Sequence, residues 1–272
     1  MRRASIILGL IVVLLVVAWY AFCIWCGWWQ RTEPPACHPS WSSQQKHELL
    51  ALDHELRYNP ICAVFGVVSP GNGISRLEQI LSSNGTTLVW GWRRFCKPAR
   101  EALHKVMATG RGDVCTSDGY PVALFALRFH KVELVKALVE HGCDPAEPYI
   151  AWDALTRQGA VSQSNLLVDT LAGCYMDYSL NLSSEKKLEL LCFLEQHGAT
   201  IYTLPDAHAA VANAAGAACG HGGDGGAAIG WLLRRGVPMN DKQKKSVQEV
   251  LLQDECLETR EALLREGLLP TE

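Results

Sequence analysis

The chain has 272 residues, a formal net charge of −3 at pH 7 and an apolar share of 49%. This length suits one extended domain or two compact ones, and the composition is that of an ordinary globular protein. The slightly negative charge provides no broad basic surface, so we expect no nucleic-acid partner.

The N-terminus is an uncharged, apolar segment that runs from Ser5 to Trp29. A bilayer core of about 30 Å requires roughly 20 apolar residues in a helix. We therefore predict one transmembrane helix within residues 1–29. Arg2 and Arg3 precede it, so the positive-inside rule places the rest of the chain on the non-cytoplasmic side, periplasmic or extracellular. The alternative is a cleaved signal peptide, although the apolar run is long for one and no small-x-small site follows it cleanly.

Residues 30–43 form a proline-containing linker between this segment and a helical domain predicted at residues 44–272. Pro34, Pro35 and Pro39 cannot continue a helix. We expect a short, stiff spacer that holds the domain away from the membrane.

The clearest helical unit reads DGYPVALFALRFHKVELVKALVEHGCDP. Tyr120 and Pro121 begin its first helix, because proline is tolerated in the first turn. The second helix is apolar on one side and ends at Gly142, the residue type favoured at a left-handed C-cap. We place Leu138 between helices and Arg128 on the exposed side of the first helix.

The ending of this second helix recurs along the chain. Other glycines have an apolar residue four positions before them: Gly85, Gly110, Gly198, Gly236 and Gly267. Together, the unit and its recurrence resemble the ankyrin repeat, which reads T-P-L-H-x-A-A, then G-H, then V-V-x-x-L-L-x-x-G-A-D-P, with a period of about 33 residues. The unit departs from that pattern at Tyr120, Ala123, Phe129 and Cys143.

This resemblance implies an all-α fold: an ankyrin-like α-solenoid of stacked helix pairs behind one N-terminal transmembrane helix. Its repeats would cover residues 59 to 269, with an insertion somewhere within Ala146–Ser184. Terminal repeats are atypical because one face meets water. We expect a capping helix at Gln44–Tyr58, with a buried leucine stripe, and a charged cap at Asp241–Glu272. A generic helical bundle, without the periodic glycine closures, is the alternative.

Motifs of catalysis are missing from the sequence, which has no G-x-S-x-G element and no phosphate loop. The glycine-rich run CGHGGDGG is interpreted as a flexible loop. We therefore expect no enzyme activity and no cofactor. A metal- or redox-active envelope protein that uses its cysteines and His221 remains the alternative. Cys143 and Cys192 are interpreted as core residues.

The resemblance implies a protein–protein interaction module, either a scaffold or an inhibitor of the immunity type. Its partner is an unidentified protein, and its membrane contact is the N-terminal helix. Turn residues and one basic, aromatic stretch supply the candidate contacts: Arg111, Asp113, Thr116, Ser117, Tyr149, Tyr202, Arg93 and Arg94. The basic, aromatic stretch is interpreted first as an inner helix with a solvated face, and the alternative is a contact with an acidic partner or with lipid headgroups. Its residues are Trp90, Trp92, Arg93, Arg94, Lys97 and Arg100.

Overall fold

The computed structural model describes residues 9–19, 21, 33–58, 86–117, 119–150, 163–172, 182–201, 210–211, 214–215, 217–218 and 223–269. The chain divides into two compact units, residues 1–108 and 109–272. The described residues are mostly helical, which confirms the predicted all-α class. Two strands of two residues each, β1 (Tyr149–Ile150) and β2 (Gln163–Ser164), pair antiparallel within the second unit.

The predicted transmembrane segment lies largely outside the described residues. Of that segment, residues 9–19 are helical. Eight consecutive side chains of this helix, from Leu10 to Val17, are apolar and between 48% and 65% exposed. Within the described ranges, no helix has both the length and the hydropathy that a membrane span requires.

In the first unit, α2 (Ser43–Tyr58) contacts α5 (Thr86–Thr109) through Asp53, which Arg100 and His104 both reach. The predicted leucine stripe of α2 is confirmed, since Leu49, Leu52 and Leu56 are at most 1% exposed. The chain before α2 also contacts α5: the Trp41 indole donates a hydrogen bond to the Val106 carbonyl over 3.2 Å. The C-terminal part of the predicted spacer is thus a packed segment of the first unit, because an aromatic ring buried on α5 anchors it.

A buried charge cluster joins α2 to α5. Arg100 Nε donates to Asp53 Oδ1 over 2.7 Å, and His104 Nε2 contacts the same oxygen at 2.6 Å. Burial raises the pKa of Asp53, but the hydrogen bonds from His104 and Arg100 outweigh it and hold the pKa below its ordinary value. Arg100 is only 3% exposed, so this residue of the basic stretch lies in the interior and not on a solvated face.

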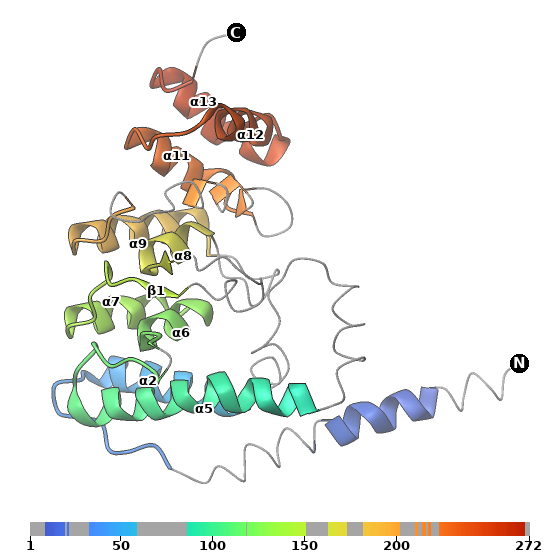
Figure 1. The fold of residues 1–272 in the computed structure, drawn as a ribbon, viewed down its shortest axis with the longest axis vertical. Helices are drawn as coiled ribbons and strands as arrows, with labels where there is room; N and C mark the ends of the chain where they lie inside the picture. Colours follow the sequence, from blue (N-terminus) through green and yellow to red (C-terminus); the bar gives the residue numbers. More distant parts are fainter. Residues whose placement is uncertain are drawn as a thin grey trace, which may run out of the picture. The chain divides into compact units, whose positions relative to one another are not determined.

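The described helices of the second unit pack against helices near them in the sequence. In chain order its helices are α6 (Val122–Arg128), α7 (Val132–Glu140), α8 (Leu166–Ala172), α9 (Ser184–Gln196), α11 (Ala227–Arg234), α12 (Asp241–Leu251), the 3-10 turn η2 (Asp254–Cys256) and α13 (Leu257–Arg265). Within pairs, α6 contacts α7, and α8 contacts α9. Between pairs, α6 contacts α8, and α7 contacts α9. Further along the chain, α9 contacts α11, and α13 contacts both α11 and α12 (Figure 1).

Four helices of this unit end in the same closure. After α7, α9, α11 and α13 the chain passes through a glycine of positive φ: Gly142 (104°), Gly198 (93°), Gly236 (62°) and Gly267 (70°). The leucine four residues earlier is 0% exposed in every case: Leu138, Leu194, Leu232 and Leu263. Its carbonyl accepts a hydrogen bond from the residue after the glycine, over 3.0, 3.0, 3.3 and 2.9 Å respectively. This is the Schellman arrangement, which satisfies carbonyls that a helix end leaves free.

The insertion expected within Ala146–Ser184 stays a prediction, because much of that range lies outside the described residues. Its described part holds the strand pair β1–β2 and the helix α8.

Two predicted side-chain positions, those of Arg128 and Cys192, are wrong. Two are confirmed: Leu138, which is 0% exposed, and Cys143. Arg128 is 8% exposed and not solvated, because every residue of α6 is buried. Cys192 is exposed on α9 and not in the core. Cys143, which follows the closing glycine of α7, is buried as predicted.

Candidate functional site

The most exposed of the predicted contact residues lie in a turn that precedes α6, which we call the finger (residues 110–121). Its two sides pair: Thr116 N–H donates to the Tyr120 carbonyl over 2.8 Å, and Val122 N–H donates to the Val114 carbonyl over 3.4 Å. Gly119 allows the reversal, because its φ is +83° and a side chain there would be strained. The finger is thus a short hairpin.

Arg111 and Asp113 face each other at the base of the finger. Arg111 Nε donates to Asp113 Oδ1 over 3.0 Å, and Nη2 donates to Oδ2. These hydrogen bonds, before any other cause, lower the pKa of Asp113 and raise that of Arg111. The Arg111 side chain is 69% exposed and the Asp113 side chain 38%. The pair therefore adds little stability but presents both charges to solvent.

Gly112, between them, faces inward. Its N–H donates to the His141 carbonyl over 2.8 Å. A Cβ at this position would lie 1.9 Å from the Leu138 carbonyl oxygen, so only glycine fits without a shift of the backbone. Arg111-Gly112-Asp113 is therefore an anchored turn whose central residue rests on the end of α7.

Two other predicted contact residues are buried and serve the fold. Thr116 is 8% exposed, and its Oγ1 accepts a hydrogen bond from Tyr120 N–H over 3.0 Å. Tyr149 is 5% exposed and donates its hydroxyl to Asp169 Oδ2 over 2.7 Å. Burial, followed by the Asp169 charge, raises the pKa of Tyr149 well above its ordinary value. Ser117 is exposed, so Arg111, Asp113 and Ser117 are the exposed residues of the finger among the predicted contacts.

The remaining predicted contacts cannot be placed. Tyr202 lies outside the described residues. Arg93 and Arg94 belong to α5, but their side chains are outside the described part.

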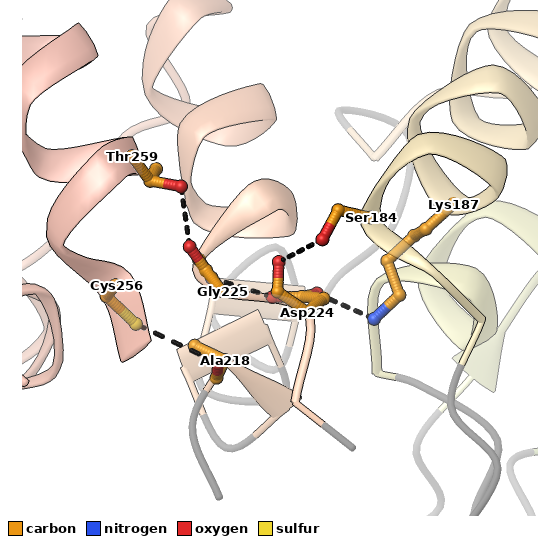
Figure 2. Close-up of polar contacts among 8 residues, drawn as sticks. Ser184, Lys187, Ala218, Asp224, Gly225, Cys256 and Thr259 are labelled. Atoms are coloured by element: carbon orange, nitrogen blue, oxygen red, sulfur yellow. Dashed lines mark hydrogen bonds and ion pairs between the residues drawn. The ribbon is translucent and has the colours of Figure 1, made fainter. Parts of the chain in front are cut away.

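A fully buried ion pair, which the sequence did not reveal, joins α9 to the turn before α11 (Figure 2). Lys187 Nζ donates to Asp224 Oδ2 over 2.6 Å, and both side chains are 0% exposed. The Ser184 hydroxyl donates to the Asp224 carbonyl over 2.9 Å, and Gly226 N–H donates to Asp224 Oδ1 over 3.0 Å. One signal was present: Lys187 precedes Leu190 and Leu194 by three and seven residues, on the buried stripe of α9.

The described end of the glycine-rich run is therefore an ordered turn and not a flexible loop. Gly225 and Gly226 have φ of +58° and +81°, and the Gly225 carbonyl accepts a hydrogen bond from the Thr259 hydroxyl over 2.5 Å. Both carboxylate oxygens of Asp224 are already bonded, so it is a poor metal ligand beside His221, which lies outside the described residues. In the described part of the chain, no three His, Cys, Asp or Glu side chains are grouped as metal ligands.

Ion pairs also connect the second helices of neighbouring pairs. Lys136–Glu189 joins α7 to α9, Glu195–Arg235 joins α9 to the end of α11, and Arg234–Glu266 joins α11 to the end of α13. Arg235 also lies over the Trp231 ring, with its Cζ 3.9 Å from the ring centroid. Because these pairs are partly exposed, each contributes little to stability.

No protein-family model, no curated protein and no solved structure matches this chain. Its function is therefore inferred from its own residues: the repeated closures, the buried junctions and the exposed end of the finger.

Proposed function

We propose that this chain is a membrane-anchored, ankyrin-like α-solenoid that binds another protein, as a scaffold or as an inhibitor of the immunity type. The observation that carries the proposal is the repeated closure of α7, α9, α11 and α13. Four helix ends of one backbone geometry, each over a buried leucine, support an array of similar units.

Contacts between neighbouring pairs support the same proposal. In a solenoid each unit packs on the next unit, and contacts run between first helices and between second helices. Here α6 contacts α8, α7 contacts α9, α9 contacts α11, and α11 contacts α13. The closing position at the end of the series also differs: Leu268 is 37% exposed, whereas Cys143, Ala199 and Val237 after the earlier glycines are at most 6% exposed.

A protein partner follows from the shape of such an array. A stack of similar units does not close on itself, and it presents a long, rigid surface on which single residues vary freely. The described face of α6 is buried, so the contact residues we propose are the exposed ones of the finger: Arg111, Asp113 and Ser117. The charges of the first two make an ionic contact that weakens as salt rises.

A matched pair of variants tests the contact surface. The full chain, purified from native membranes with its partner, is compared with the Arg111→Glu and Lys186→Glu variants. Both reverse one exposed positive charge, but Lys186 lies on α9 away from the finger sequence. We expect Arg111→Glu to reduce partner recovery at least tenfold and Lys186→Glu to leave it within twofold. Equal recovery with both variants would contradict the finger as the contact surface.

The membrane anchor and its orientation are tested separately. The eight exposed apolar side chains from Leu10 to Val17 support an anchor, because water would strongly disfavour such a helix. A reporter fused after Glu272 should be active outside the cytoplasm and silent inside it. A reporter that is active only in the cytoplasm would contradict the orientation, and recovery of the chain in the soluble fraction would contradict the anchor.

A further inference from the structure

Two segments meet where the base of the finger passes the end of α7. Gly112 N–H donates to the His141 carbonyl, and the His141 ring Nδ1 lies 2.9 Å from the Gly110 carbonyl oxygen. Cys143 N–H donates over 3.0 Å to the Leu138 carbonyl, the same oxygen that a Cβ at Gly112 would meet. The start of the finger and Cys143 therefore flank a single carbonyl group.

Cys115 completes this neighbourhood. It forms a bridge with Pro121 across the finger, and its thiol points back toward the Asp113 carbonyl, 3.8 Å from Sγ. The charges of Asp113 and Glu147 act on both Cys115 and Cys143, and Cys115 acts directly on Cys143. The hydrogen bonds between residues 110–112 and His141 hold two short segments side by side. Cys115 follows Gly112 by three residues and Cys143 follows His141 by two, so the two cysteines leave the same junction.

We propose that Cys115 and Cys143 are a disulfide-forming pair, which ties the finger to the end of α7 when the chain meets a small-molecule disulfide such as oxidised glutathione. Both are free thiols in this structure. The Cys115 sulfur attacks the small-molecule disulfide, and one glutathione thiolate leaves. The Cys143 sulfur then attacks the Cys115 sulfur and releases the second. The protein loses two S–H bonds and gains one S–S bond, while the glutathione disulfide takes up two electrons and the two protons.

The order of the two attacks follows from exposure. Cys115 is half-buried, whereas Cys143 is 4% exposed, so only Cys115 is open to a molecule of the size of glutathione. Cys143 attacks only the Cys115 sulfur of the same chain, so it does not need access to solvent. Access and thiolate fraction together govern the rate of thiol–disulfide exchange.

The surroundings favour a disulfide that resists reduction. Burial first, and then Cys115 and nearby carboxylates, raise the pKa of Cys143 to about 12. Burial, and then the charge of Glu147, also raise the pKa of Cys115. Reduction must expel one of the two sulfurs as a thiolate, and a sulfur of high pKa leaves slowly. The same shifts lower the thiolate fraction of the reduced pair, so the bond both forms and breaks slowly.

Tryptic peptides test the pairing directly, and the test does not depend on the binding function. Cleavage after Arg111, Arg128, Lys136 and Arg157 places Cys115 and Cys143 on separate peptides, residues 112–128 and 137–157, with one cysteine each. The full chain in detergent is equilibrated at about pH 8.5 with oxidised glutathione, alkylated and digested. We expect one ion with the summed mass of the two peptides less two hydrogens, which a reductant converts to the separate peptides.

Variants make the outcome decisive. Cys115→Ser should abolish the cross-linked ion and leave Cys143 alkylated after denaturation. Cys143→Ala, a small apolar replacement for a buried thiol, should also abolish it. Cys192→Ser removes the exposed cysteine of α9 and should leave the ion unchanged. In the wild type, oxidation should also slow hydrogen exchange at residues 112–117 and 141–147. The proposal is overturned if both peptides remain unlinked in a chain whose Cys192 is glutathionylated, or if either cysteine pairs elsewhere.

Discussion

Replacing Asp224 with alanine removes one partner of a charge pair that has no contact with solvent. Lys187 Nζ and Asp224 Oδ2 are 2.6 Å apart, and both side chains are 0% exposed. Asp224→Ala leaves the ammonium group buried without its counter-charge and frees the N–H of Gly226, which donates to Asp224 Oδ1. Breaking a buried pair in this way costs about 3–5 kcal/mol.

A second ion pair, between α9 and the end of α11, provides the control. Glu195 of α9 and Arg235 at the end of α11 form an ion pair whose side chains are 41% and 26% exposed. Because water screens that pair, Glu195→Gln should cost less than about 1 kcal/mol. The comparison isolates burial, since both pairs join α9 to the α11 segment.

A double variant separates the pair interaction from the packing of each side chain. Lys187→Met retains most of the side-chain volume, and Asp224→Asn retains an oxygen for the Gly226 N–H. Each single change leaves a buried group mismatched, but the double variant contains no buried charge. We expect its loss to be smaller than the sum of the two single losses by about 2–3 kcal/mol.

Denaturant unfolding of the full chain in detergent, with hydrogen exchange, measures these effects. In a stack of units the loss should appear first at α9 and α11 and only later at α6 and α7, because each unit packs on its neighbours. A cost below about 1 kcal/mol for Asp224→Ala would refute the reasoning, since the pair would then behave as an exposed one. A uniform loss of protection across the second unit would argue for one cooperative core.

Three further predictions concern packing, backbone and charge. Leu138→Ala should cost about 2–5 kcal/mol in denaturant unfolding, because Leu138 is 0% exposed and its loss leaves a cavity, whereas Glu140→Ala on the same helix should stay within about 0.5 kcal/mol. Gly112→Ala should lower the melting temperature by an amount equivalent to about 1–3 kcal/mol, because its Cβ would clash with the Leu138 carbonyl; an unchanged melting temperature would mean that the finger does not rest on α7. The lowered pKa of Asp53 implies stability that is complete above the unfolded pKa of about 3.9 and is lost as the pH falls through the lower folded value. Unfolding midpoints between about pH 2 and pH 6 should therefore fall in the wild type and change less in Asp53→Asn.

The elements that the sequence predicted correctly are those whose cause is local. The leucine spacing in Gln44–Tyr58 predicted α2 and its buried stripe, since a helix places such residues on one face. The glycines at 142, 198, 236 and 267 predicted where helices end, because only glycine takes the left-handed conformation without strain. Leu138 and Cys143 were correctly assigned to the interior from their positions relative to Gly142, which ends the helix.

The sequence could not tell which of the candidate contact residues are exposed and which are buried. Arg111, Asp113, Thr116, Ser117 and Tyr149 are all residue types common in turns and at contact surfaces. The structure leaves the first two and Ser117 exposed but buries the hydroxyls of Thr116 and Tyr149 against Tyr120 N–H and Asp169. Which hydroxyl turns inward depends on the acceptor or donor that another segment supplies.

The sequence alone determined the helical period, the helix ends and the apolar faces of this protein, because each depends on residues within a turn or two of one another. The tertiary structure decided which of its charged side chains are buried. Lys187 lies in a charged run that resembles the solvated start of a helix. It is buried because Asp224, from a turn distant in sequence, forms an ion pair with it. Arg100 is buried for the same reason, by Asp53 of another helix. A charge can leave water only when a partner replaces the lost hydration, and that partner is set by which segments the fold brings together.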